Sequence, residues 1–170
     1  MSEATGEFAD YAAARWLTLV RSAVLLGCTP SEAEDVAQET LTRCLVGWTR
    51  VTAARHRDAY VSAILVNCFR DSRRSGWRQR ERPVATVPDA SEPDRTDLAD
   101  TAAAVDAALG TLSPGQREVL TLRFYLQLTE PQVAEALGVA VGTVKSRTAR
   151  ALSALAADTN LADLRDGGTR

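Results

Sequence analysis

Three short segments of this chain carry the side-chain pattern that starts an α-helix. In each, Ser or Thr is followed by Pro within two residues and by Glu or Gln at the third; the segments are Thr29-Pro30-Ser31-Glu32, Ser113-Pro114-Gly115-Gln116 and Thr129-Glu130-Pro131-Gln132. The hydroxyl caps the first turn, where Pro is tolerated, and Glu or Gln closes the capping box. Ser31 with Glu34 makes an equally good box, so that helix starts at either of two positions.

The spacing of apolar residues predicts a chain built only of helices. Apolar positions recur every three to four residues over residues 8–27, 29–48, 58–74, 97–109, 113–124, 129–137 and 141–156. No segment alternates with a period of two, so the fold class is all-α, with two small helical domains joined by a flexible linker. Positions expected to face the core include Trp16, Leu45, Trp48, Tyr60, Val105, Phe124 and Leu152.

The composition is that of a globular protein. Of 170 residues, 45% are apolar and 25% charged, and no apolar run approaches the roughly 20 residues that span a bilayer. The N-terminus has neither a basic stretch nor an apolar core, so no signal peptide is expected. We therefore expect a cytoplasmic protein with no membrane insertion.

Residues that usually carry metal or acid–base chemistry are sparse. The chain has three widely spaced cysteines, Cys28, Cys44 and Cys68, and one histidine, His56. We expect three small buried thiols, with redox sensing as the alternative. A lone histidine lacks the partners of a metal site or a catalytic dyad. No cofactor, metal or catalytic residue is predicted, and the composition speaks against an enzyme.

Charge is distributed unevenly along the chain. Residues 1–49 carry seven acidic side chains against three arginines, whereas residues 70–82 carry six arginines against two acids. Residues 83–110 are acidic again, with six Asp or Glu and one Arg. Basic patches on an otherwise acidic chain are typical of proteins that bind nucleic acid, because the patches neutralise phosphate charge.

Residues 129–150 predict a helix-turn-helix. Two short helices meet at Gly138, which permits the bend, and the small Ala134 lets the helices approach closely. The second helix directs small, polar and basic residues away from its apolar stripe; these are Gly142, Thr143, Lys145, Ser146, Arg147 and Arg150. Such a helix can enter the major groove of DNA. The alternative is the solvated face of a plain helical bundle.

Four stretches of the chain resemble a known family. Residues 112–124 (LSPGQREVLTLRF), 129–138 (TEPQVAEALG) and 142–147 (GTVKSR) are similar to region 4 of bacterial sigma factors. Residues 31–41 (SEAEDVAQETL) are similar to the core-polymerase-binding helix of region 2. The motifs occur in the family's order and spacing. The chain thus resembles the extracytoplasmic-function (group IV) sigma factors of the sigma-70 family, with an actinobacterial origin expected.

The resemblance implies a plan of domains. It assigns residues 1–82 to region 2, residues 83–96 to an acidic Pro-rich linker, residues 97–160 to region 4 and residues 161–170 to a polar tail. In the family this linker threads the RNA exit path, although a simple tether would explain its composition equally well.

The resemblance also implies roles for residues of region 2. In the family the polar face of the binding helix contacts the β′ clamp of core RNA polymerase, which corresponds here to Asp35, Gln38, Glu39 and Thr42. Without the resemblance, this acidic face would be taken for solvated surface. The residues that correspond to the family's -10 readers are Asn67, Arg70, Arg73, Arg74, Trp77 and Arg78. Asn67 is expected to read a flipped base, and Trp77 either stacks on a base or packs in the core.

In region 4 the resemblance assigns reading of the -35 element to the second helix of the helix-turn-helix, through Gly142, Thr143, Lys145, Ser146, Arg147 and Arg150. The preceding helix, with Arg117 and Arg123, is expected near the β flap and upstream DNA. Where the family often has a Ser or Thr cap, this chain has Ala140, so the start of the reading helix is expected to fray before DNA orders it.

The expected function is therefore that of a sigma factor, which binds core RNA polymerase and promoter DNA and directs promoter-specific transcription initiation. An anti-sigma factor is a candidate further partner. The alternative is a stand-alone helix-turn-helix regulator that binds duplex DNA without polymerase. The acidic face at residues 32–42 and the arginine-rich run at residues 70–82 favour the sigma factor, because a repressor needs neither.

Overall fold

The computed structural model describes residues 3–80 and 105–157, with side chains described for residues 5–75 and 105–157. The predicted all-α class is confirmed, and no strand occurs in these ranges.

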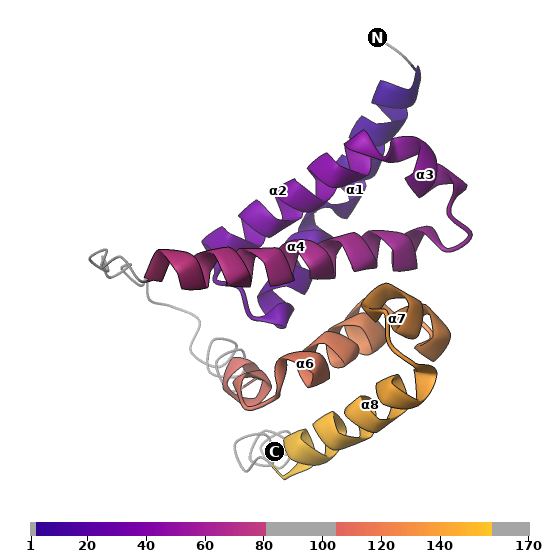
Figure 1. Cartoon of the computed structure of the whole chain (residues 1–170). Coiled ribbons are helices and arrows are strands. Elements are labelled where there is room, and N and C mark those ends of the chain that lie inside the picture. The colour runs from indigo at the N-terminus through magenta and orange to yellow at the C-terminus, as the bar shows by residue number, and fades with distance from the viewer. Residues whose placement is uncertain (1–2, 81–104, 158–170) are drawn as a thin grey trace, which may run out of the picture.

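The N-terminal lobe contains α1 (Glu3–Leu26), α2 (Pro30–Val46), α3 (Trp48–Ala53) and α4 (Arg57–Arg80) (Figure 1). The C-terminal lobe contains α6 (Pro114–Leu120), the π-helix η1 (Thr121–Tyr125), α7 (Glu130–Leu137) and α8 (Val141–Ala156). Residues 105–110 are also helical. The predicted linker, the first part of the predicted helix 97–109 and the predicted tail lie outside the described residues.

All three predicted helix starts are confirmed. At α2 the Thr29 hydroxyl accepts a hydrogen bond from the Glu32 backbone N–H at 3.4 Å, and the Glu32 carboxylate accepts one from the Thr29 N–H at 2.8 Å. The same reciprocal pair of bonds closes at Ser113 and at Thr129. Each capping box satisfies backbone N–H groups that have no partner inside the helix. Helix α2 therefore starts after Thr29, and the alternative start at Ser31 is wrong.

The helices differ from the prediction mainly at their ends. Helix α1 begins before residue 8, α4 continues past residue 74, and the chain breaks at Gly47 to form the extra helix α3. This break turns Trp48 inward, where its side chain is only 8% exposed and its ring centroid lies 5.2 Å from those of Phe8 and Tyr11. Burying the Trp48 indole against two aromatic rings lowers the free energy of the folded state, which explains why α3 turns this side chain inward.

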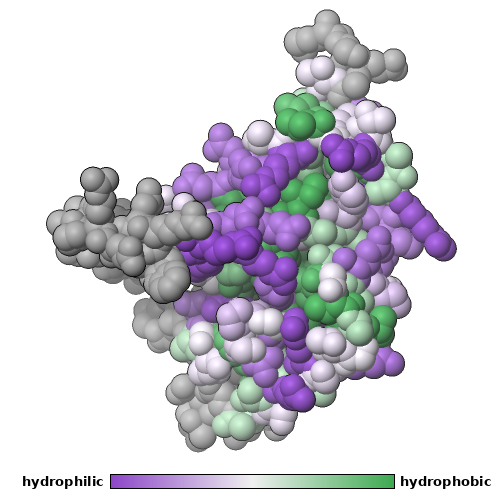
Figure 2. Space-filling view, viewed as in Figure 1, coloured by the Kyte–Doolittle hydropathy of each residue, from purple (hydrophilic) through white to green (hydrophobic). Residues whose placement is uncertain are grey.

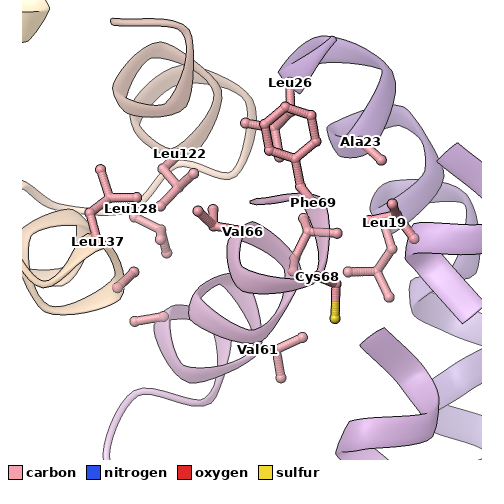
Figure 3. Close-up of a cluster of buried hydrophobic side chains, with 14 of the residues drawn as sticks. Leu19, Ala23, Leu26, Val61, Val66, Cys68, Phe69, Leu122, Leu128 and Leu137 are labelled. Atoms are coloured by element: carbon pink, nitrogen blue, oxygen red, sulfur yellow. The ribbon is translucent and has the colours of Figure 1, made fainter. Parts of the chain in front are cut away.

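Helix α4 is shared by the two lobes. Helices α1 and α2 pack together on one side of α4, and α7 packs on its other side (Figure 1). One apolar cluster extends through both lobes, from Leu19 of α1 through Val66 of α4 to Leu122 of η1 (Figure 3). A second, smaller cluster of Leu112, Leu120 and Ala151 joins α6 to α8. The sequence predicted two small helical domains joined by a linker, whereas the main apolar cluster belongs to both lobes.

Several side chains expected in the core are in fact 37–56% exposed; they are Trp16, Leu45, Tyr60, Val105, Phe124 and Leu152. On α2 the buried side is formed by Val36, Thr40 and Cys44 together with Ala33 and Ala37. The Thr40 hydroxyl is tolerated there because it donates to the Val36 carbonyl at 2.7 Å. Since α2 packs against both α1 and α4, its buried side is rotated away from the simple apolar stripe.

Candidate functional site

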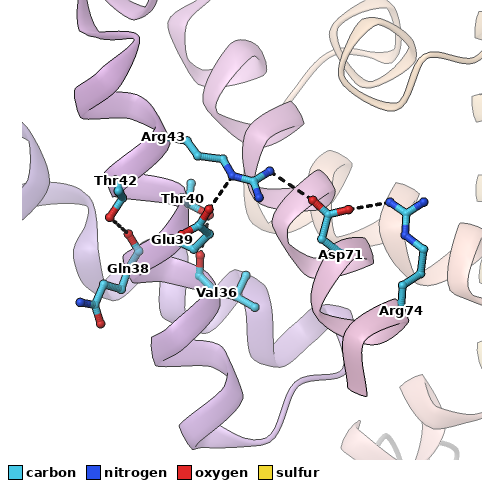
Figure 4. A network of polar contacts seen from close by, with 8 residues as sticks. All are labelled: Val36, Gln38, Glu39, Thr40, Thr42, Arg43, Asp71 and Arg74. Carbon is cyan, nitrogen blue, oxygen red and sulfur yellow. Dashed lines mark hydrogen bonds and ion pairs between the residues drawn. The ribbon is translucent and has the colours of Figure 1, made fainter. Parts of the chain in front are cut away.

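The four predicted polymerase-binding residues lie together on the solvent side of α2. Asp35, Gln38, Glu39 and Thr42 are all exposed, because they are spaced three and four residues apart along the helix. The Thr42 hydroxyl donates to the Gln38 carbonyl at 2.9 Å (Figure 4). The capping box at Thr29 fixes where this helix begins. These residues therefore present one continuous polar surface with a negative charge.

A groove of about 530 Å³ runs between α2 and α4 beside this surface. Its carboxylates come from Glu32, Asp35 and Glu39 on α2 and from Asp71 on α4. Hydrophilic side chains gather over the same two helices (Figure 2). A concave surface of this charge is complementary to a basic helix of a partner protein.

A chain of ion pairs joins α2 to α4 along this groove. Arg43 Nε lies 2.7 Å from Glu39 Oε1, Arg43 Nη1 lies 3.2 Å from Asp71 Oδ2, and Arg74 Nη2 lies 2.6 Å from Asp71 Oδ1 (Figure 4). Hydrogen bonds from Arg74 and Arg43 lower the pKa of the Asp71 carboxyl. The chain connects a predicted polymerase contact, Glu39, with a predicted DNA contact, Arg74.

The predicted -10 residues extend from the middle of α4 toward its C-terminal end, where the two lobes meet. Asn67 is exposed, and together with Arg70 and Arg73 it lines a cavity of about 780 Å³ whose other wall is formed by α6 and Leu112. Arg73 donates to the Gly27 carbonyl and lies over the Phe69 ring, with its Cζ atom 5.4 Å from the ring centroid. Trp77 and Arg78 belong to α4, but their side chains lie outside the described residues, so the two alternatives for Trp77 stay open.

The partner of Arg70 in the folded chain, Glu118, was not predicted from the sequence. The Glu118 side chain is only 5% exposed and accepts two hydrogen bonds from Arg70, at 2.8 Å from Nε and 2.7 Å from Nη2. This pairing raises the pKa of Arg70. No local pattern predicts the contact, because the two residues are 48 positions apart. The one signal in the sequence is a carboxylate placed directly before the apolar pair Val119 and Leu120.

The helix-turn-helix is formed as predicted. Gly138 adopts the left-handed conformation (φ 66°, ψ 36°), and the Val139 N–H donates to the Ala134 carbonyl at 3.0 Å. Ala134 is buried and α7 packs on α8. The cap of α8 is Ala140, whose side chain makes no capping hydrogen bond. The two helices are thus fixed relative to each other at the turn.

The six predicted -35 residues are not equally exposed. Gly142, Lys145 and Arg150 are exposed, whereas Thr143, Ser146 and Arg147 are half-buried. The Ser146 hydroxyl donates to the Thr143 carbonyl at 3.1 Å, and Lys145 Nζ lies 3.8 Å from Glu130 Oε2 on α7. The exposed residues form the side of α8 that a groove of DNA could reach.

Two other arginines make contacts inside the protein. The helix with Arg117 and Arg123 is predicted to lie near the polymerase flap and upstream DNA, and this stays a prediction. In the free chain Arg117, 14% exposed at its side chain, donates to the Leu25 carbonyl of α1, and Arg123 donates to the Leu128 carbonyl at 2.7 Å. Both side chains are occupied in holding the fold together.

Nowhere in residues 3–80 and 105–157 do three or more metal-ligating side chains come together. Within the same ranges no helix combines the length and the apolar character needed to cross a membrane.

Comparison with known proteins identifies the family. The sequence profile described as Sigma-70, region 4, matches residues 102–155. The RNA polymerase sigma-E factor of Streptomyces avermitilis is 38% identical over 162 residues, which span 93% of this chain and 88% of the relative. The ECF RNA polymerase sigma factor SigL of Mycobacterium tuberculosis is 35% identical over 155 residues, spanning 86% of this chain and 82% of the relative.

Two solved structures share the fold. The sigma factor RpoE from Bartonella quintana, in complex with the anti-sigma factor NepR, has 26% identity and a TM-score of 0.64, and the match covers 88% of this chain and 94% of that chain. CnrH in complex with the cytosolic domain of CnrY has 25% identity and the same TM-score, covering 88% and 85%. The chain belongs to the extracytoplasmic-function sigma factors of the sigma-70 family, groups with their actinobacterial members, and as a sigma factor binds core RNA polymerase and directs promoter-specific transcription initiation.

Proposed function

We propose that the two lobes divide promoter recognition between them. Residues 1–82 act as region 2, which binds core polymerase and opens the -10 element, and residues 97–160 act as region 4, which binds the -35 element. Residues 83–96 link them, and residues 161–170 form a tail. The observation that carries this proposal is that one chain has both an acidic face on α2 and a helix-turn-helix with exposed basic residues on α8. A stand-alone regulator needs only the second surface.

The polymerase contact is the exposed face of α2, made of Asp35, Gln38, Glu39 and Thr42. Support comes from the groove beside it, since the groove adds the carboxylate of Glu32 to the same negative surface, whereas Asp71 is paired with Arg43 and Arg74. Such a surface steers a basic partner helix and selects its orientation. The partner segment is the clamp of the β′ subunit, and the β flap is the expected contact of region 4.

The -10 contact extends from the middle of α4 toward its C-terminal end. Asn67, Arg70, Arg73 and Arg74 follow one another at helical spacing, which lets them line up along a single DNA strand. The Asn67 amide carries a donor and an acceptor for a base edge, and the guanidinium groups pair with phosphates. Trp77 and Arg78 continue the same helix and extend the proposed contact.

The -35 contact is the N-terminal part of α8. Gly142 has no side chain to hold the helix tip away from the bases, and Lys145 and Arg150 are exposed. The half-buried Thr143, Ser146 and Arg147 lie beside them and complete the proposed contact. Phosphate contacts position such a helix in the major groove, and contacts with base edges specify the sequence.

Family membership also bears on catalysis, location and regulation. The chain has no catalytic residue of its own, because the polymerase supplies the chemistry. It acts in the cytoplasm, where bacterial polymerase works. A regulatory partner of the anti-sigma class is proposed because the two similar solved structures are complexes, one of them with the anti-sigma factor NepR and the other with the cytosolic domain of CnrY.

The proposal is tested by mixing the purified chain with actinobacterial core polymerase and measuring co-elution in size exclusion. The chain should co-elute, and the double variant Asp35→Lys with Glu39→Lys should not. Because Glu39 pairs with Arg43, circular dichroism must show that the variant keeps its helices. The matched control is Glu7→Lys with Asp10→Lys, which changes the charge equally on the exposed side of α1. Co-elution of the α2 variant would refute the interface, and no co-elution of the unaltered chain would favour a stand-alone regulator.

A further inference from the structure

The C-terminal lobe packs against the part of α4 that carries the proposed -10 contact. Val66 is fully buried, and it points toward Leu122 and Leu128 of the C-terminal lobe (Figure 3). Its chain neighbour Asn67 is the proposed base reader. The apolar contact between the lobes and the proposed DNA contact thus occupy adjacent sides of one helix.

A charged contact fixes this arrangement. Arg70 donates two hydrogen bonds to the Glu118 carboxylate of α6, at 2.8 and 2.7 Å, and the Glu118 side chain is 5% exposed. A carboxylate with so little access to water is costly unless it is paired, so Glu118 depends on Arg70 in this arrangement. Arg70 depends less on Glu118, because its own side chain is 37% exposed.

In this contact the Glu118 carboxylate takes the place that a DNA phosphate would have on Arg70. Guanidinium groups bind carboxylates and phosphates through the same planar fork of N–H donors. While Glu118 accepts from both Nε and Nη2, those donors cannot serve a DNA backbone. Glu118 therefore competes with promoter DNA for Arg70.

A second polar contact closes the lobes on the same side. Arg117, next to Glu118, donates to the Leu25 carbonyl at the end of α1. The turn after α1 lies beside this contact, since a Cβ atom on Gly27 (φ +115°) would be in van der Waals contact with Arg117 Nη1 at 3.4 Å and with Arg73 Nη2 at 3.6 Å. Two successive residues of α6 thus bind two different helices of the N-terminal lobe.

We infer that Glu118 is an anionic latch: in the chain without polymerase it occupies Arg70 in place of a DNA phosphate, and the lobes must separate before α4 can bind the -10 strand. This inference rests on the proposed function of α4. The cavity of about 780 Å³ between the lobes is then the closed form of the DNA-binding surface, with Asn67 and Arg73 on one wall and Pro114 on the other. Polymerase binding releases the latch by holding the two lobes apart on separate surfaces.

The test compares the unaltered full chain with Glu118→Gln, which keeps the shape of the side chain and removes its charge. Binding to a fluorescein-labelled oligodeoxythymidine of about 20 nucleotides is measured by anisotropy without polymerase. Small-angle X-ray scattering reports the radius of gyration of each protein. The control Glu34→Gln removes one carboxylate from an exposed position on α2. Circular dichroism confirms the fold, and Glu118→Met serves as a second variant if Glu118→Gln unfolds.

The expected result is that Glu118→Gln is larger than the unaltered chain and binds the oligonucleotide at least about fivefold more tightly, the lower end of typical couplings between sites. Adding Arg70→Ala to the Glu118→Gln variant should abolish the gain in affinity for the oligonucleotide, and Glu34→Gln alone should show no gain in affinity. A variant that stays compact and binds no more tightly would overturn the latch. A variant that opens without binding more tightly would overturn it too. Neither result would touch the proposed function, which co-elution through α2 tests separately.

Discussion

The guanidinium group of Arg147 on α8 lies directly on Gly115 in the first turn of α6, where a Cβ atom would stand 3.1 Å from its Cζ and Nη1 atoms. Arg147 is half-buried by this contact, whereas Arg150, three residues further along α8, is exposed. Two basic residues with the same proposed role therefore have different surroundings, and substitutions should separate their effects.

Arg147→Ala should lower both stability and DNA binding. Losing the packed stem and guanidinium should reduce the free energy of unfolding by about 1 kcal/mol. Arg150→Ala should change it by less than about 0.5 kcal/mol. Each substitution should reduce the salt dependence of duplex DNA binding by about one phosphate contact. Urea denaturation and binding titrations at several salt concentrations measure the two effects. Equal stability losses would contradict the contact with Gly115.

Ala140→Ser should stabilise α8. Ala140 already has the extended backbone of a helix cap (φ −69°, ψ 149°), but its side chain makes no capping hydrogen bond. A serine hydroxyl there can accept from the first turn, which should raise the free energy of unfolding by about 1 kcal/mol. Urea denaturation measures the change. Ala149→Ser, at an exposed position within the same helix, is the control and should give no gain.

Asp71 should make the stability sensitive to acid. Arg74 and Arg43 lower the pKa of Asp71 in the folded state. Its contribution to the free energy of unfolding is therefore present above about pH 4 and is lost as the pH falls through this lowered pKa. Asp71→Asn should therefore destabilise the protein at neutral pH, and the difference should vanish in strong acid.

The size of this effect is limited by solvent, because the Asp71 side chain is 46% exposed. We expect a difference in unfolding free energy below about 1 kcal/mol. Denaturation across the acid range measures it. In an Arg74→Gln background the same substitution should cost less, because the main partner is gone. A difference that persists in strong acid would show that Asp71→Asn acts through packing instead.

The three thiols should be inert in the folded protein. Cys28, Cys44 and Cys68 are buried, and burial raises the pKa of Cys28 and of Cys44 to about 11 and raises that of Cys68. Only the thiolate attacks a disulfide reagent, so labelling with dithionitrobenzoate near neutral pH should be slow. All three thiols should react rapidly once urea unfolds the chain. Rapid labelling of one cysteine in the folded protein would instead support redox sensing.

The sequence by itself determined the features whose causes are local. Each capping box joins residues three positions apart, so Thr29, Ser113 and Thr129 could be recognised as helix starts without any tertiary information. The left-handed turn at Gly138 is local in the same sense. The exposed face of α2 was also predicted correctly, because helical spacing alone places Asp35 and Glu39 on one side.

Only the tertiary structure decided which apolar side chains are buried and which charges meet. Leu45 and Phe124 follow helical spacing yet are exposed, because no neighbouring helix covers them sufficiently, whereas Val66 is buried because the C-terminal lobe packs on α4. The pairing of Arg70 with Glu118 likewise joins positions 48 residues apart. Such contacts depend on how whole helices pack, and periodicity within one helix carries no information about the partner that will cover it.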